Sequence, residues 1–202
     1  MAAFAGSFLL ADAASFIFKI SAGFLMAFVL GILLGWASYA CSFVKDLLEP
    51  PMLLIRSVPV ASFVILALIW IGSDGLSVFI SFLVVIPMIY TGTLTGLEHT
   101  DRELLEMSRV FSFSFFKRLR YIYIPAVHPY LLSSCRTALG MSWKSGVAAE
   151  VIGIPQASIG EQLYYSKLYL DTAGLFAWTF AIIVISAVFE RFFLSLLMRV
   201  RH

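Results

Sequence analysis

The fold is decided by the stretch HTDRELLEMSRVFSFSFFKRLRYIYIP, residues 99–125, which separates two strongly apolar segments of the chain. Acidic residues come first and basic residues last, an order that matches the helix dipole if a helix begins near Glu98. One interpretation is a solvated loop whose charges set the orientation of the neighbouring spans in the membrane. That interpretation leaves the leucines and phenylalanines of the stretch unexplained, and apolar residues rimmed by charge favour a protein docking surface.

The composition around this stretch predicts an all-α integral membrane protein. Hydrophobic residues make up 61% of the 202 residues and charged residues 13%, against roughly 45–50% and about 25% in soluble domains. The mean hydropathy is +0.95. A soluble domain of this length could not bury so much apolar surface, and a net charge of only +2 argues against nucleic acid as a partner.

About five segments are long and apolar enough to cross the bilayer, which needs about 20 residues per helix. They lie at residues 20–44, 52–71, 76–97, 124–147 and 175–198. Helices buried in a large soluble protein are the alternative, but these would need polar faces that the segments lack.

The distribution of Lys and Arg predicts the orientation of these spans. If the N-terminus is outside, the outer side holds only Lys19, Lys144 and Lys167. The cytoplasmic side then holds Lys45, Arg56, Arg102, Arg109, Lys117, Arg118, Arg120, Arg191, Arg199 and Arg201. This orientation puts residues 99–125 and His202 in the cytoplasm.

The spacing within the polar stretch resembles the EAA loop of ABC importer permeases. That loop reads Glu-Ala-Ala, then a glycine six residues after the Glu, then Ile-x-Leu-Pro. The matching positions here are Glu106, Met107, Ser108, Ser112 (in place of the glycine), Ile122 and Pro125, with Phe111 as an apolar anchor. In that family the loop folds as short helices that dock on a separate ATPase subunit.

The resemblance covers roughly residues 15 to 198 and implies the type I ABC importer permease (MetI-like) fold. Arg56-Ser57-Val58-Pro59 and Trp70-Ile71-Gly72 resemble its second core span. Residues 138–144 with Ala149-Glu150 resemble the branch that carries nitrate, sulfonates, taurine or pyrimidine precursors. The domains are then a short segment 1–14, a permease domain 15–198 with a coupling loop at 98–122, and a tail 199–202. Because few residues precede the first core span, we expect a minimal five-span form or a shortened start.

The resemblance also implies the partners. They are an ABC ATPase, a second permease subunit (most simply a homodimer), an extracytoplasmic substrate-binding protein and the lipid of a bacterial-type inner membrane. The solute would be small and anionic or heterocyclic. This chain would hold no cofactor, since ATP and magnesium would be bound by the ATPase. The membrane coupling subunit of an energy-coupling-factor vitamin transporter is the alternative, and an integral membrane enzyme is a third.

Four residues are candidates for the pathway or a gate: Arg136, Trp143, Lys144 and Glu150. A charge midway along a span is costly, so Arg136 should face protein or water. It either attracts an anionic solute or pairs with Glu190 or with carbonyls freed near the prolines of its own helix. Residues 153–171 resemble the family's re-entrant element, although an interfacial aromatic belt would explain the tyrosines there equally well.

Small residues at four-residue spacing form stripes on three spans. They are Gly23, Ala27, Gly31 and Gly35, then Gly92 and Gly96, then Ser134, Ala138, Ser142 and Gly146. Such stripes let helices approach closely in lipid. Packing within one chain is the simpler interpretation, and a seam between two subunits is the other.

Catalytic and metal sites are not predicted. Cys41 and Cys135 lack ligand spacing, the histidines are scattered, and the Lys-Ser pair after Trp143 lacks the glycine of a P-loop. The first ten residues contain no basic residue, so a cleaved signal peptide is not expected.

Overall fold

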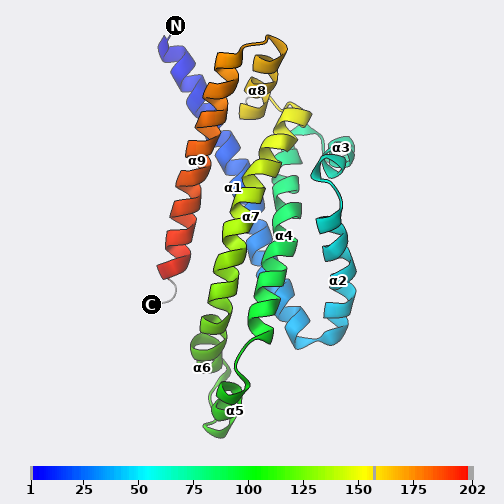
Figure 1. The fold of residues 1–202 in the computed structure, drawn as a ribbon, viewed down its shortest axis with the longest axis vertical. Coiled ribbons are helices and arrows are strands. Elements are labelled where there is room, and N and C mark those ends of the chain that lie inside the picture. Colours follow the sequence, from blue (N-terminus) through cyan, green and yellow to red (C-terminus); the bar gives the residue numbers. More distant parts are fainter. Residues whose placement is uncertain (1, 157, 200–202) are drawn as a thin grey trace.

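The structure, a computed structural model, describes residues 2–156 and 158–199, and side chains from Ser15 onward. The described chain is almost entirely helical (Figure 1). Its elements are α1 (Ala2–Ala40), α2 (Ser42–Ser57), α3 (Val60–Ile71), α4 (Ser73–Glu98), α5 (Arg102–Val110), α6 (Phe115–Arg118), a π-helix (Leu119–Tyr123), α7 (Ile124–Gly153), α8 (Ile159–Leu168) and α9 (Thr172–Arg199).

Helix α4 is the centre of the bundle because it packs along both α1 and α7. Of its most apolar window 56% is buried, against 6% for α9, which presents phenylalanines to the outside. The short helices α5 and α6 lie at one end of the elongated molecule, and α3 and α8 lie near the other (Figure 1). The start of α1 lies at the end opposite to α5 and α6, as the predicted topology requires.

In the described part of the chain, three helical segments are long and apolar enough to cross a membrane: Ser15–Ala40 within α1, α4 and α9. Helices α2 and α3 together would make a fourth, but they are bent by 104°. The prediction of one continuous span at 52–71 is therefore wrong. Pro59 explains the bend, because proline cannot continue the helical hydrogen bonds and forces Val58 into an extended conformation (ψ 133°).

Two other predicted spans also differ from the structure, one in its end and one in its hydropathy. Helix α1 stops at Ala40, and extended Cys41 turns the chain into α2, so residues 42–44 do not belong to the first span. Helix α7 has 30 residues but is not among the segments apolar enough to span by composition. Its charged and hydroxyl side chains lower its hydropathy. It lies among other helices rather than alone in lipid.

The stripes of small residues hold the bundle together within one chain. A side chain at Gly31 would come within 2.9 Å of Ile89, and one at Gly35 within 2.8 Å of Thr93, so this stripe seats α1 on α4. The other two stripes seat α4 on α7, since Gly92 meets Ser134. Packing within the chain, the simpler of the two interpretations, is confirmed for these contacts. Close backbone approach is the main source of helix association in lipid.

We expect Gly92→Ala to destabilise the bundle by about 1–3 kcal/mol, because the added methyl would collide with the Ser134 side chain. Gly140→Ala is the matched control, since nothing lies within 4 Å of the added carbon, and alanine favours the helix by roughly 1 kcal/mol. Thermal unfolding in detergent, followed by size-exclusion chromatography, should show a lower midpoint for the first variant only. Equal midpoints would contradict the close α4–α7 packing.

Candidate functional site

The polar stretch folds into the two short helices α5 and α6, which form one tip of the molecule (Figure 1). Helix α5 begins at Arg102 with Asp101 as its N-cap, whose carboxylate accepts a 2.8 Å hydrogen bond from the Glu103 N–H. The predicted helix start near Glu98 is therefore wrong, because α4 ends there. Glu106 lies in the middle of α5, exposed to solvent, and the capping role falls to Asp101.

The turn after α5 explains two positions of the sequence motif. Ser112 has a φ of +52°, and the Phe113 N–H donates to the Ser108 carbonyl at 2.9 Å, which closes the helix in a left-handed cap. This is the conformation that glycine adopts most readily. The position at which the motif has glycine therefore does require a left-handed residue. Ser108 is fully buried beneath the turn, whereas Met107 is exposed, so only the former must stay small.

Apolar side chains project from this tip into solvent. Phe111 is 68% exposed and Phe116 79% exposed, and Val110 and Phe115 are open as well. Charged residues surround them, all exposed: Arg102, Glu103, Glu106, Arg109, Lys117 and Arg120. This arrangement is typical of a surface that another protein covers.

The tip is joined rigidly to the bundle by the π-helix that leads into α7. Ile122 is buried within it, and the Ile124 N–H reaches back five residues to Leu119. Proline in a helix lacks an N–H and clashes with the carbonyl four residues earlier, and a wider π-turn just before Pro125 relieves both problems. The Ile122 and Pro125 positions thus build a continuous helical path from α6 into α7.

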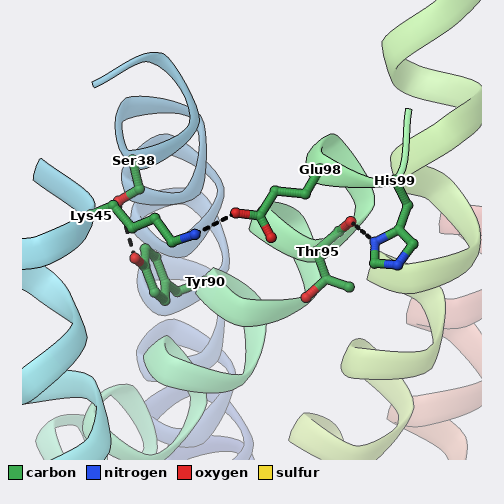
Figure 2. A network of polar contacts seen from close by, with 6 residues as sticks. All are labelled: Ser38, Lys45, Tyr90, Thr95, Glu98 and His99. Atoms are coloured by element: carbon green, nitrogen blue, oxygen red, sulfur yellow. Dashed lines mark hydrogen bonds and ion pairs between the residues drawn. The ribbon is translucent and has the colours of Figure 1, made fainter. Parts of the chain in front are cut away.

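A polar network lies where the tip meets the bundle (Figure 2). Lys45 at the start of α2 forms a 2.6 Å ion pair with Glu98, the last residue of α4. Tyr90 donates to Ser38 of α1 at 3.1 Å, and the His99 ring contacts the Thr95 carbonyl at 2.9 Å. The root of α5 is therefore tied to α2 through Glu98.

The four candidate pathway residues separate into two pairs. Arg136 and Lys144 are exposed on one face of α7, and neither has an ion pair or hydrogen bond to the described part of the chain. Arg136 thus makes no ion pair with Glu190, one of its two expected intramolecular partners. Trp143 is buried between Phe16 and Phe189, with ring centroids 5.5 and 5.6 Å away.

Glu150 is also buried, and its contacts position α8 against α7. One carboxylate oxygen accepts a 3.2 Å hydrogen bond from the Gly160 N–H in the first turn of α8. Ser158 caps the same turn through the Glu161 N–H at 3.1 Å. A side chain at Gly160 would collide with Glu150, so glycine is required for α8 to sit this close to α7.

A cavity of about 460 Å³ lies between α4 and α7 and is reached by Arg56 of α2. Sequence reasoning placed Arg56 at the cytoplasmic end, but the structure shows its guanidinium donating to the Pro87 carbonyl, midway along α4, at 3.1 Å. Hydroxyl side chains dominate the lining: Thr91, Thr95, Tyr130, Ser133, Ser134 and Thr137. The sequence signal for this site was the hydroxyl residues at helical spacing on two neighbouring spans.

The described bundle therefore defines a membrane transport component. It combines membrane-length helices, a hydroxyl-lined cavity and an exposed apolar tip. The chain belongs to the family of binding-protein-dependent transport system inner membrane components, whose family model matches residues 27–202. The expectation of a transport component in place of an enzyme is thereby confirmed.

The chain is also similar to two curated permeases. It is 25% identical over 177 residues to an aliphatic sulfonates transport permease protein of Bacillus subtilis, covering 87% of this chain and 64% of that protein. It is 27% identical over 169 residues to a nitrate import permease protein of Synechocystis, covering 78% and 62%. The chain thus spans less than two thirds of the length of either relative.

The solved structure supports the fold alone. It is the crystal structure of an amino acid ABC transporter with histidines, with a TM-score of 0.64, 18% identity, and coverage of 100% of this chain and 95% of that one.

We expect Ser112→Gly to stabilise the turn after α5 by about 1 kcal/mol, because glycine adopts a positive φ without the steric cost of a side chain. Hydrogen exchange at the Phe113 amide, which closes the turn, should slow about fivefold. Ser114→Gly is the control, since Ser114 lies in the extended region (φ −63°) and gains nothing from glycine. Faster exchange in Ser112→Gly would contradict the strained cap.

Proposed function

We propose that this chain is a permease subunit of an ATP-driven ABC importer, and that α5 and α6 couple it to a separate ATPase. The observation that carries the proposal is the exposed apolar tip at the motif spacing from Glu106 to Pro125. A free membrane subunit would expose several phenylalanines to water there. An ATPase subunit with a matching groove would cover them and would bind the ATP and magnesium.

The remaining partners follow from the same proposal. The exposed polar face of α7, with Arg136 and Lys144, needs a cover other than lipid. A second copy of the chain would supply it, and the two α7 faces would enclose one pathway. A soluble binding protein would deliver the solute at the end that holds α8. The energy-coupling-factor alternative is not favoured, because the matched family is binding-protein-dependent.

The proposed orientation puts the tip and the C-terminal end in the cytoplasm and the start of α1 outside. The charge asymmetry of the sequence supports this orientation even without Arg56, which lies at mid-membrane depth. We propose a small solute that is anionic or heterocyclic. The exposed cations on α7 favour the anionic class, and the two relatives are named for sulfonates and nitrate.

The structure offers a route from the tip to the pathway. Movement of α5 would pull on Glu98 and, through Lys45, on the start of α2. It would also pass through the π-helix into α7. Because α2 and α7 both line the cavity, a displacement of the docked tip would change the cavity from two sides.

We expect Phe111→Asp and Glu106→Ala each to abolish uptake while the protein still inserts in the membrane. An anchor lost from a buried interface typically costs about 2 kcal/mol or more of binding. Co-purification of the ATPase measures docking directly, and it should be lost in Phe111→Asp. Phe43→Asp is the matched control, because Phe43 is equally exposed (73%) at the same end of the molecule but lies outside the tip.

Retention of the ATPase and normal uptake in both tip variants would contradict the coupling role. Loss of the ATPase in Phe43→Asp as well would show that any charge at this end disturbs the complex. That result would also count against a docking role specific to the tip.

The Lys45–Glu98 ion pair allows a second test of coupling. We expect Glu98→Lys to lower uptake at least fivefold with the ATPase still bound, because two cations would then repel one another at the root of α5. The exchange Lys45→Glu with Glu98→Lys should restore most of the uptake. No rescue by the exchange, with both proteins inserted equally, would show that the pair does not transmit the motion.

A further inference from the structure

We infer that Arg56 and the hydroxyl-lined cavity beside it form a binding site for a small oxyanion group, of the size of nitrate or a sulfonate. The inference rests on the proposed function, since it gives the solute a resting place within this subunit. It names a residue that the sequence placed at the cytoplasmic end of a span and that the structure places beside the middle of α4, with its side chain exposed to the open side of the cavity.

Arg56 lies well away from the cytoplasmic end of the helices. A helix rises about 1.5 Å per residue, so Pro87, which accepts the Arg56 hydrogen bond, lies roughly 16 Å from the Glu98 end of α4. The guanidinium is therefore level with the middle of α4, on an exposed side chain. A charge at that depth is costly unless it faces protein, water or a counter-ion.

Arg56 has unused hydrogen-bonding capacity. A guanidinium has five N–H donors in a planar fork that suits two oxygens of one anion. In the described part of the chain, a single donor is used, on the Pro87 carbonyl, and no carboxylate pairs with the side chain. The remaining donors are available to the cavity.

The walls of the cavity are rich in hydrogen-bond donors. Of the six hydroxyl side chains that line it, Thr91 and Thr137 donate to backbone carbonyls of their own helices. The other four can rotate to donate a hydrogen bond to an anion: Thr95, Tyr130, Ser133 and Ser134. A binding site for a cation would be expected to contain a carboxylate, and no Asp or Glu is among the lining residues. A volume of about 460 Å³ exceeds what nitrate or a short sulfonate needs, so the rest of the solute and some water would fit as well.

Several cations follow one another along the bundle axis. Lys144 and Arg136 are exposed on α7 towards the α8 end, and Thr137, next to Arg136, lines the cavity. Beyond Arg56 a smaller cavity of about 160 Å³ continues between α2 and α4 to Lys45. Arg56 lines both cavities, so it stands between the two hollows. The smaller cavity also contains Glu49, which would disfavour an anion there and help it to leave.

The test measures the charge preference of the cavity independently of transport. Ser133→Cys places a thiol in the wall, in a protein whose Cys41 and Cys135 have been replaced and which is assembled with its ATPase in lipid nanodiscs. The thiol is labelled with two methanethiosulfonates of similar size, the anionic sulfonatoethyl and the cationic trimethylammonioethyl reagent. Each rate is divided by the rate with free 2-mercaptoethanol.

We expect the anionic reagent to be favoured about tenfold, as charge-lined clefts raise local counter-ion concentration. Arg56→Gln should bring the two rates to near parity, and Arg56→Lys should keep much of the preference. Arg191→Gln, an exposed cation on α9 away from the cavity, is the matched control and should change nothing. Millimolar nitrate or methanesulfonate should slow labelling in the Arg56 protein but not in Arg56→Gln, and choline should have no effect.

Equal rates for the two reagents in the Arg56 protein would overturn the site. A preference lost in Arg136→Gln but kept in Arg56→Gln would assign it to the wrong arginine and would overturn the inference equally. Neither result touches the docking of the ATPase, which is measured separately by co-purification. The proposed function can therefore stand if the oxyanion site falls.

Discussion

Hydrocarbon sets the constraint on which the rest of this structure depends, because it gives helices no hydrophobic reason to associate and no partner for a charge. The first consequence is the close seating of α4 between α1 and α7 on small residues such as Gly31, Gly35 and Gly92. The second is that every charge at membrane depth must face protein or water. The positions of Arg56 and Arg136 follow from that requirement, as does the polar composition of α7.

The sequence predicted the features that depend on local pattern. Hydropathy located the membrane segments, and motif spacing located the tip. The left-handed turn at Ser112 falls at the position of the motif's glycine and was found only in the structure. It failed where one proline or one tertiary contact decides the outcome. Pro59 turned an expected span into a bent pair. The break at Cys41 started α2 earlier than expected, which put Arg56 beside the middle of α4 instead of at the cytoplasmic end. Hydropathy averages over such breaks, so no window could have found them.

Residue roles were harder to predict than residue positions. Trp143 and Glu150 were identified as gate candidates by resemblance, yet both are buried in contacts with neighbouring helices. Glu150 caps α8 through the Gly160 N–H, a contact between residues ten apart that depends on how the intervening turn is folded. A polar residue near the end of a span indicates a polar contact at that position. Only the packing shows whether the residue faces the solute or holds in place a helix that faces it.

The tip and the cavity share two structural elements, and this sharing limits how the protein can work. Helix α7 continues the π-helix from the tip and carries one cavity wall, while α2 is tied by Lys45 to Glu98, just before the tip, and carries Arg56. In the proposed coupling, a displacement of the tip would change the cavity by moving α2 and α7 relative to α4. Helices α2 and α3 are bent by 104° at Pro59 and do not form one continuous rod. Because Arg56 holds the Pro87 carbonyl by a single hydrogen bond, the same movement would reposition the guanidinium between the two hollows.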